Sequence, residues 1–227
     1  MSTQASLPAA VIFDVDGTLT DTEPAWERVR AALAAEDGAD YRPEHALAMM
    51  GMSTREWSTY LSEVVGLNGS AEDCARRTID GMRELYHGGV DILPGARQVV
   101  RAMAELVPVG IASSSPVVLI EAAIEELGIG DVVSAHVSTE QVERGKPAPD
   151  GYLRCCELLG VDPTQCLAIE DSTAGITSAL AAGMSVVAIP QPFHQPDEEL
   201  LARCTVLPDL THLTPQLVGR LATTDPA

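Results

Sequence analysis

The sequence predicts an α/β protein with a doubly wound parallel-sheet core and a helical domain inserted after the first strand. Short apolar runs alternate with segments of helical periodicity, which is typical of a parallel sheet covered by helices on both faces. The first two apolar runs are separated by an interval that is too long for one crossover and reads only as helices. At 227 residues, with 46% hydrophobic and 21% charged residues, the chain has the size and composition of an ordinary folded protein.

Five apolar runs are predicted to form buried strands. They occupy residues 10–13, 107–112, 132–137, 166–170 and 185–189. Gly128, Gly160 and Gly183 stand where the helices before the last three of these strands would end. Residues 206–207 are expected to add an edge strand, and residues 213–221 a last amphipathic helix. Ligand sites of such sheets lie at the carboxyl ends of the strands, so residues that follow strands are the first candidates for a site.

The long interval predicts a second domain. We expect residues 24–89 to form a helical cap domain, and residues 1–23 and 90–227 to form the core domain, because apolar residues recur at helical spacing throughout the insert. The insert directly follows the first strand, which would place it over the carboxyl edge of the sheet. A helical lid in that position can exclude water and select a substrate.

Charge and cysteine content exclude several classes of partner. The net charge of −19 disfavours nucleic acids and anionic membranes, because their phosphates would be repelled. The five cysteines are odd in number and show no C-x-x-C spacing, which disfavours zinc and a disulfide framework and favours reduced thiols. The leader has no signal-peptide pattern and no apolar run approaches the length of a membrane helix, so we expect a cytoplasmic protein.

The run Val11-Ile-Phe-Asp-Val-Asp-Gly-Thr-Leu-Thr-Asp21 is the most informative segment of the chain. An apolar strand here delivers Asp14 and Asp16 into a glycine turn, and burying unpaired carboxylates is costly. A cation is therefore expected beside them, either a metal ion or a lysine. The chain contains one lysine, Lys146, among 14 basic residues. A compact ammonium in a tight site cannot be replaced by the arginine that this chain otherwise prefers.

Four polar motifs fall at the predicted ends of successive strands. They are Asp14 and Asp16, the run Ser113-Ser114-Ser115, Lys146, and the pair Glu170-Asp171. This set suits phosphoryl transfer: one Asp attacks phosphorus and a second handles the leaving-group proton. Serine hydroxyls and turn amides bind phosphate oxygens, while lysine and Mg²⁺ offset the repulsion between nucleophile and phosphate.

Together these motifs resemble motifs I to IV of the haloacid dehalogenase-like (HAD) superfamily, whose core is Rossmann-like. The insert resembles the helical type-1 cap of that superfamily, and the resemblance covers residues 10–220. The stretches Asp21-Thr-Glu-Pro-Ala-Trp26 and Ala112-Ser-Ser-Ser-Pro116 are most similar to those of its sugar- and hexitol-phosphate phosphatases.

The resemblance implies a role for each motif residue. Asp14 would be the nucleophile and Asp16 the general acid/base, while Lys146 would bridge the nucleophile and the phosphate. Phosphate would be held by Ser113, the amide of Ser114 and Lys146. Mg²⁺ would be held by Asp14, the backbone carbonyl of Asp16, Asp171 and, directly or through water, Glu170.

The residues that read the leaving group are less well defined. The candidates on the cap side are Glu23, Trp26, Gly51 and Arg55. Trp26 is as easily interpreted as core and Arg55 as part of a solvated face, and Glu23 is undecided. The expected partner is a small phosphorylated metabolite, and the expected assembly is a monomer or a weak homodimer.

Within the superfamily, the expected activity is Mg²⁺-dependent hydrolysis of a small sugar or polyol phosphate through an aspartyl-phosphate. A β-phosphoglucomutase-like mutase is the second choice. Such mutases usually carry histidine where Trp26 stands, and they have a cap lysine that this insert lacks. A phosphoglycolate-type phosphatase is a further alternative. Asp16 argues against the dehalogenases, which lack this second Asp, and the lysine-free insert excludes phosphonatase chemistry.

Two alternatives come from other classes of protein. A signalling receiver domain also uses a phosphoacceptor Asp, Mg²⁺, a hydroxyl and a lysine. It is half this length, has no helical cap and places the phosphoacceptor after the third strand. An acidic interaction protein on an inactive phosphatase scaffold is disfavoured because every catalytic position is intact.

Overall fold

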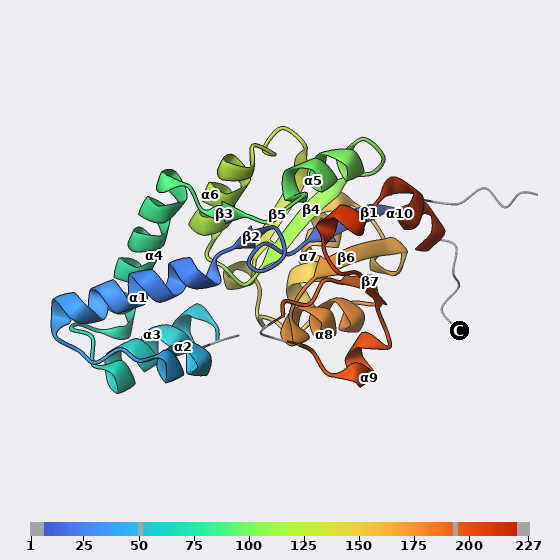
Figure 1. Ribbon diagram of the computed structural model, residues 1–227. Helices are drawn as coiled ribbons and strands as arrows, with labels where there is room; N and C mark the ends of the chain where they lie inside the picture. Colours follow the sequence, from blue (N-terminus) through green and yellow to red (C-terminus); the bar gives the residue numbers. More distant parts are fainter. Residues whose placement is uncertain (1–6, 50–51, 193–194, 222–227) are drawn as a thin grey trace, which may run out of the picture.

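The computed structural model describes residues 7–49, 52–192 and 195–221, and its centre is a six-stranded parallel sheet (Figure 1). The strands lie in the order β5-β4-β1-β6-β7-β8. Their bounds are β1 Ala10–Phe13, β4 Val109–Ser113, β5 Val133–Ser138, β6 Cys166–Glu170, β7 Ser185–Ala188 and β8 Thr205–Val206. The chain runs from β1 to β4 and β5 on one side, then returns to β6 on the other. Ligands of such sheets bind where the order reverses, which here is beside β1.

Helices cover both faces of the sheet because successive strand residues point to opposite sides. Val11 and Phe13 belong to the larger apolar core, which they share with α5, α6 and α10. Ile12 belongs to a second core, which it shares with α7 and α8. The helices are α5 Ala96–Ala104, α6 Val117–Leu127, α7 Asp150–Leu159, α8 Thr173–Ala181, the single turn α9 Glu198–Leu201, and α10 Pro215–Leu221. This doubly wound arrangement confirms the predicted fold class.

Within the described residues, four α-helices lie between the short strands β2 and β3, to one side of the sheet (Figure 1). They are α1 Glu23–Asp37, α2 Pro43–Met49, α3 Thr54–Tyr60, which continues as the π-helical turn Leu61–Val65, and α4 Ala71–Gly88. Ser53 and Ser70 begin α3 and α4 with capping boxes, which satisfy the first backbone amides of both helices. The helical insert is therefore present, while its division from the core at residues 24 and 89 stays a prediction.

The longest helix in the described part of the chain is α4, and one of its faces is buried. Cys74, Thr78, Met82 and Tyr86, spaced four residues apart, are its buried residues. No helix in the described ranges combines the length and the hydropathy needed to cross a membrane.

Both connections between the sheet and the insert run through a small antiparallel ribbon. It pairs β2 (Thr20–Asp21) with β3 (Asp91–Ile92). This ribbon fixes the point above the sheet edge at which α1 begins. The sequence did not predict it, because two residues are too few to show an alternating pattern.

The five strands predicted from apolar runs are all present, with bounds that agree to within two residues. The predicted edge strand is β8, one residue earlier than expected. β5 differs from the prediction in its burial: its first four residues are exposed or half-buried, whereas a buried strand was expected. The reason is its place at the edge of the sheet, where it has one neighbouring strand.

Candidate active site

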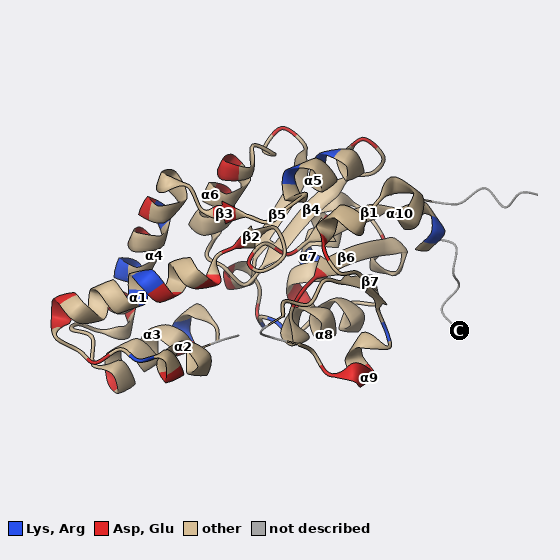
Figure 2. Cartoon of the chain, viewed as in Figure 1, with Lys and Arg blue, Asp and Glu red and all other residues tan. Residues whose placement is uncertain are grey.

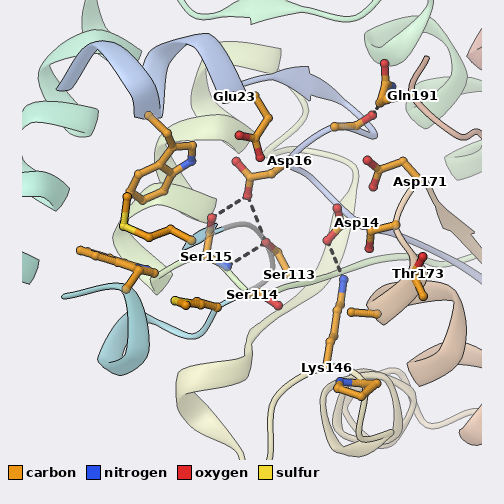
Figure 3. Close-up of a pocket in the computed structure, with 18 of the residues that line it drawn as sticks. Asp14, Asp16, Glu23, Ser113, Ser114, Ser115, Lys146, Asp171, Thr173 and Gln191 are labelled. Carbon is orange, nitrogen blue, oxygen red and sulfur yellow. Dashed lines mark hydrogen bonds and ion pairs between the residues drawn. The ribbon is translucent and has the colours of Figure 1, made fainter. Parts of the chain in front are cut away.

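The carboxyl ends of β1 and β4, the residues after β6 and the loop after β5 meet at a cavity of about 490 Å³ (Figure 3). From the core, the predicted residues that line it are Asp14, Asp16, Ser113, Ser114, Lys146 and Asp171. From the insert, the lining residues are Glu23, Trp26, Arg30, Met49, Met52 and Trp57. All four predicted motifs therefore contribute to one cavity.

The turn that follows β1 is tight and depends on a glycine. The amides of residues 18–20 all donate to the carbonyl oxygen of Val15, at 2.8–3.2 Å. Gly17 has a φ of 81°, and a Cβ placed on it would lie 2.2 Å from Oδ2 of Asp171. The turn can pack its backbone against Asp171 only because position 17 carries no side chain.

Lys146 holds two buried carboxylates together. Its Nζ donates to Oδ1 of Asp14 and to Oε1 of Glu170, each at 2.6 Å, and its side chain is only 6% exposed. The hydroxyl of Tyr152 donates to the same Glu170 oxygen at 2.8 Å, and Ser172 Oγ donates to Oε2 at 3.2 Å. Glu170 is completely buried and bonded through both oxygens, so it positions Lys146 against Asp14.

Negative charge exceeds positive charge at this end of the cavity. Burial raises the pKa of the Asp14 carboxyl to about 7; Lys146 opposes this rise, and the charges of Glu170 and Asp16 add to it. Burial followed by the charges of Glu170 and Asp14 raises the pKa of Asp171 well above its usual value. Burial alone would lower the pKa of Lys146, but the two carboxylates outweigh it and raise that pKa. One ammonium does not neutralise the cluster.

The excess charge and the donor atoms fit a divalent cation. One carboxylate oxygen from each of Asp14, Glu170 and Asp171 lies within 4.8 Å of the others. Hard cations such as Mg²⁺ prefer oxygen ligands, and such an ion would offset the charge that Lys146 leaves. Asp16 was predicted to contribute its backbone carbonyl, and its carboxylate is not part of this group.

The Asp16 carboxylate instead faces the serines that follow β4. Ser115 Oγ donates to Oδ2 of Asp16 at 2.5 Å, and Ser113 Oγ lies 3.4 Å from the same oxygen (Figure 3). Thr22 Oγ1 donates to Oδ1 at 2.6 Å. These bonds hold the carboxyl beside the charged cluster, where it can exchange a proton with a group bound between β1 and β4.

A family model described as haloacid dehalogenase-like hydrolase matches residues 8–183 of the chain. The chain belongs to this family. Hexitol phosphatase B of Escherichia coli (strain K12) is 34% identical over 224 residues, which cover 94% of this chain and 97% of that protein. Fructose-1-phosphate phosphatase YqaB of the same strain is 32% identical over 179 residues, which cover 79% and 95%. The crystal structure of β-phosphoglucomutase from Clostridium difficile has the same fold, with a TM-score of 0.77, 23% identity, and coverage of 95% and 97%.

In this haloacid dehalogenase-like hydrolase, the predicted cap residues separate into three groups. Glu23 and Trp26 line the cavity from α1. Arg55, predicted as a substrate candidate, is exposed on α3 and is not among the described residues that line the cavity. Gly51 lies outside the described residues.

Sequence reasoning missed several residues of the site. They are Thr22, Arg30, Trp57, Ser115, Tyr152 and Ser172. Thr22 and Ser115 stood inside the quoted motifs and could have been found there. Arg30 follows Trp26 by four residues, which places both on one helix face once the helix is assigned. Tyr152 had no such signal, because only the packing of α7 against the sheet brings it to Glu170.

Gly175 allows α8 to pack against the buried Glu170. A Cβ placed at this position would lie 1.9 Å from Oε1 of Glu170. We expect Gly175→Ala to displace that carboxylate and to lower the free energy of unfolding by about 1–3 kcal/mol, measured by denaturant titration. Gly88→Ala is the matched control, because no described atom outside its own helical turn and chain neighbours lies within 4 Å of its Cβ position. A Gly175→Ala variant as stable as the wild type would contradict this packing.

Proposed function

We propose that this protein is a Mg²⁺-dependent phosphatase that hydrolyses a small sugar or polyol phosphate monoester through an aspartyl-phosphate intermediate. The observation that carries the proposal is the 2.6 Å contact between Asp14 and Lys146 in the wall of the cavity, beside Asp16. A buried carboxylate held by an ammonium is placed to act as a nucleophile. The similarity to a hexitol phosphatase and to a fructose-1-phosphate phosphatase supports the substrate class.

In the first step, a carboxylate oxygen of Asp14 attacks the phosphorus atom and the bond from phosphorus to the leaving oxygen breaks. Asp16 enters this step protonated and gives its proton to that oxygen, so that the leaving group departs as an alcohol. Lys146, the Ser113 hydroxyl and the Ser114 amide bind the non-bridging oxygens. Thr22 and Ser115 keep the Asp16 carboxyl oriented through the hydrogen bonds described above.

In the second step, Asp16 accepts a proton from a water molecule while the water oxygen attacks phosphorus. The bond between phosphorus and Asp14 breaks, inorganic phosphate is formed, and both carboxyl groups return to their starting states. One residue therefore serves as acid in the first step and as base in the second.

The same proposal assigns the metal site. Asp14 and Asp171 would hold Mg²⁺ together with the backbone carbonyl of Asp16, and Glu170 would contribute directly or through water. When bound, the ion supplies positive charge that reduces the repulsion between the Asp14 carboxylate and the phosphate.

The test is hydrolysis of p-nitrophenyl phosphate, with and without metal, followed by a panel of phosphorylated metabolites. We expect EDTA to abolish turnover and Mg²⁺ to restore it. In Asp171→Asn, the Mg²⁺ concentration for half-maximal activity should rise at least about tenfold, because a donor to the ion is weakened. Asp91→Asn, which removes an exposed carboxylate outside the cavity, is the control. Full activity in EDTA would contradict the metal assignment.

A β-phosphoglucomutase-like mutase is the second candidate, and one observation favours it. The insert lacks lysine, but Arg30 brings a buried cation to the cap side of the cavity, where a mutase would need one for a second phosphate. Incubation with a hexose 1-phosphate separates the two functions: a mutase yields an isomeric sugar phosphate, whereas a phosphatase yields free sugar and inorganic phosphate. A phosphoglycolate-type phosphatase would be identified by the same panel.

The proposal includes the partners and the setting of the enzyme. Figure 2 shows acidic residues on helices and loops of the core and the insert alike, and the net charge of −19 supports a metabolite rather than nucleic acid or a membrane as the partner. We place the enzyme in the cytoplasm as a monomer or weak homodimer. Light scattering during size-exclusion chromatography tests the assembly.

A further inference from the structure

Arg30 is a buried cation on the cap side of the cavity. Its residue is only 8% exposed, and its guanidinium carbon lies 4.9 Å from the ring centroid of Trp26 and 5.5 Å from that of Trp57. The two rings meet edge to face, with centroids 5.8 Å apart. Burial lowers the pKa of Arg30, which the nearby Tyr41 and Glu23 counteract only in part. Nothing in the phosphoryl-transfer chemistry requires this residue.

One donor atom of Arg30 is available to a bound ligand. Its Nε is buried and has no hydrogen-bond partner among the described residues. Buried donors are rarely left unsatisfied, and the free-energy cost is greater when the group is charged. Contact with aromatic rings engages the faces of a guanidinium, whereas its N–H groups point outward in its plane. An oxygen atom bound in the cavity would satisfy this donor.

The excess of acidic side chains around the cavity favours an uncharged oxygen atom over an anion as the partner of Arg30. The described lining includes five carboxylate residues against two basic ones. The acidic residues are Asp14, Asp16, Asp21, Glu23 and Asp171, and the basic ones are Lys146 and Arg30. The phosphate of the substrate already adds negative charge on the core side of the cavity. A second anion beside Arg30 would also face the charge of Glu23, which acts on the same guanidinium.

We propose that Arg30 donates a hydrogen bond to a hydroxyl oxygen of an uncharged polyol or sugar leaving group and is therefore a specificity-determining residue. The inference rests on the proposed phosphatase function and adds the residue that reads the leaving group. Trp26 and Trp57 hold the guanidinium plane in place, so the donor is oriented before the substrate binds.

Binding measurements test Arg30 independently of turnover. In an Asp14→Asn background with Mg²⁺, sorbitol 6-phosphate and inorganic phosphate are titrated by calorimetry. Adding Arg30→Met should weaken sorbitol 6-phosphate about 10- to 100-fold, and inorganic phosphate less than about threefold, because only the first ligand carries a polyol group that can reach the cap side. Arg28→Met, an exposed site on the same helix, should change neither affinity. Arg30→Lys keeps the charge without the planar N–H edge and should show the same selectivity loss to a smaller degree.

Kinetics of the variants in the otherwise wild-type enzyme provide the second measurement. Arg30→Met should raise KM for sorbitol 6-phosphate by a similar factor, with little change for p-nitrophenyl phosphate, which has no hydroxyl groups. Equal weakening of both titrated ligands, or no weakening, would overturn the inference. A larger loss for fructose 1,6-bisphosphate than for sorbitol 6-phosphate would also overturn it, because Arg30 would then read an anion. Absence of phosphatase activity in the wild type would refute the proposed function, while the titrations would still decide the role of Arg30.

Discussion

Replacement of Asp14 by asparagine is expected to reduce the hydrolysis of every phosphate monoester by about 10⁶-fold, the loss that follows removal of a covalent nucleophile. Asparagine has nearly the same shape, and its amide oxygen can still accept the hydrogen bond from Lys146. It is a poor nucleophile because it lacks the negative charge. The measurement is kcat for p-nitrophenyl phosphate at saturating Mg²⁺.

The same substitution should leave the protein folded. It removes one charge from a cluster in which burial and like charges already disfavour ionised Asp14, so the melting temperature without metal should not fall. Asp91→Asn is the matched control and should retain wild-type activity. A folded Asp14→Asn variant with more than about one thousandth of wild-type kcat would contradict the assignment of the nucleophile. A loss of up to about a thousandfold can result from removing a residue that only stabilises the transition state.

Replacement of Lys146 by arginine is expected to lower kcat by about 10²- to 10³-fold, although the charge is conserved. Nζ contacts Asp14 and Glu170 at 2.6 Å each, within a site that leaves the side chain 6% exposed. A guanidinium is larger, planar and forked, so it cannot occupy the point between these two carboxylates without displacing one of them. Steady-state kinetics with p-nitrophenyl phosphate measure the effect.

Arg144→Lys is the matched control for this exchange. Arg144 lies in the same loop and pairs with Asp150, but its side chain is 67% exposed. An exposed ion pair contributes little, so the control should keep both activity and stability. Near-normal turnover by Lys146→Arg would contradict the claim that the site requires a compact ammonium.

The strand framework and the core motifs were predictable because each depends on a local signal. Apolar runs marked the strands, and polar residues directly after them marked the carboxyl edge. The scarcity of lysine drew attention to Lys146. These local signals were enough to predict the site because a parallel sheet brings the carboxyl ends of its strands to one edge. The structure accordingly gathers Asp14, Ser113, Lys146 and Asp171 around one cavity.

The remaining features depend on contacts between segments far apart in the sequence. Tyr152 reaches Glu170 only because α7 packs under the sheet, and the Asp16 carboxylate turns toward Ser115 rather than toward the acidic cluster. Arg30 lies in no recognisable motif. Because an arginine on an amphipathic helix usually points to solvent, its burial could not be predicted. The edge position of β5 followed from the strand order, which apolar runs alone do not reveal.

The central claim, that Asp14 becomes phosphorylated during turnover, is tested most directly by trapping the intermediate. Wild-type enzyme turning over substrate with Mg²⁺ is quenched in acid, digested and mapped by mass spectrometry. The account predicts one added phosphoryl group on the peptide that contains Asp14, removable by hydroxylamine as expected of an acyl phosphate and absent from Asp14→Asn. A phosphoryl group on another residue, or rapid hydrolysis with none trapped at any quench time, would contradict it.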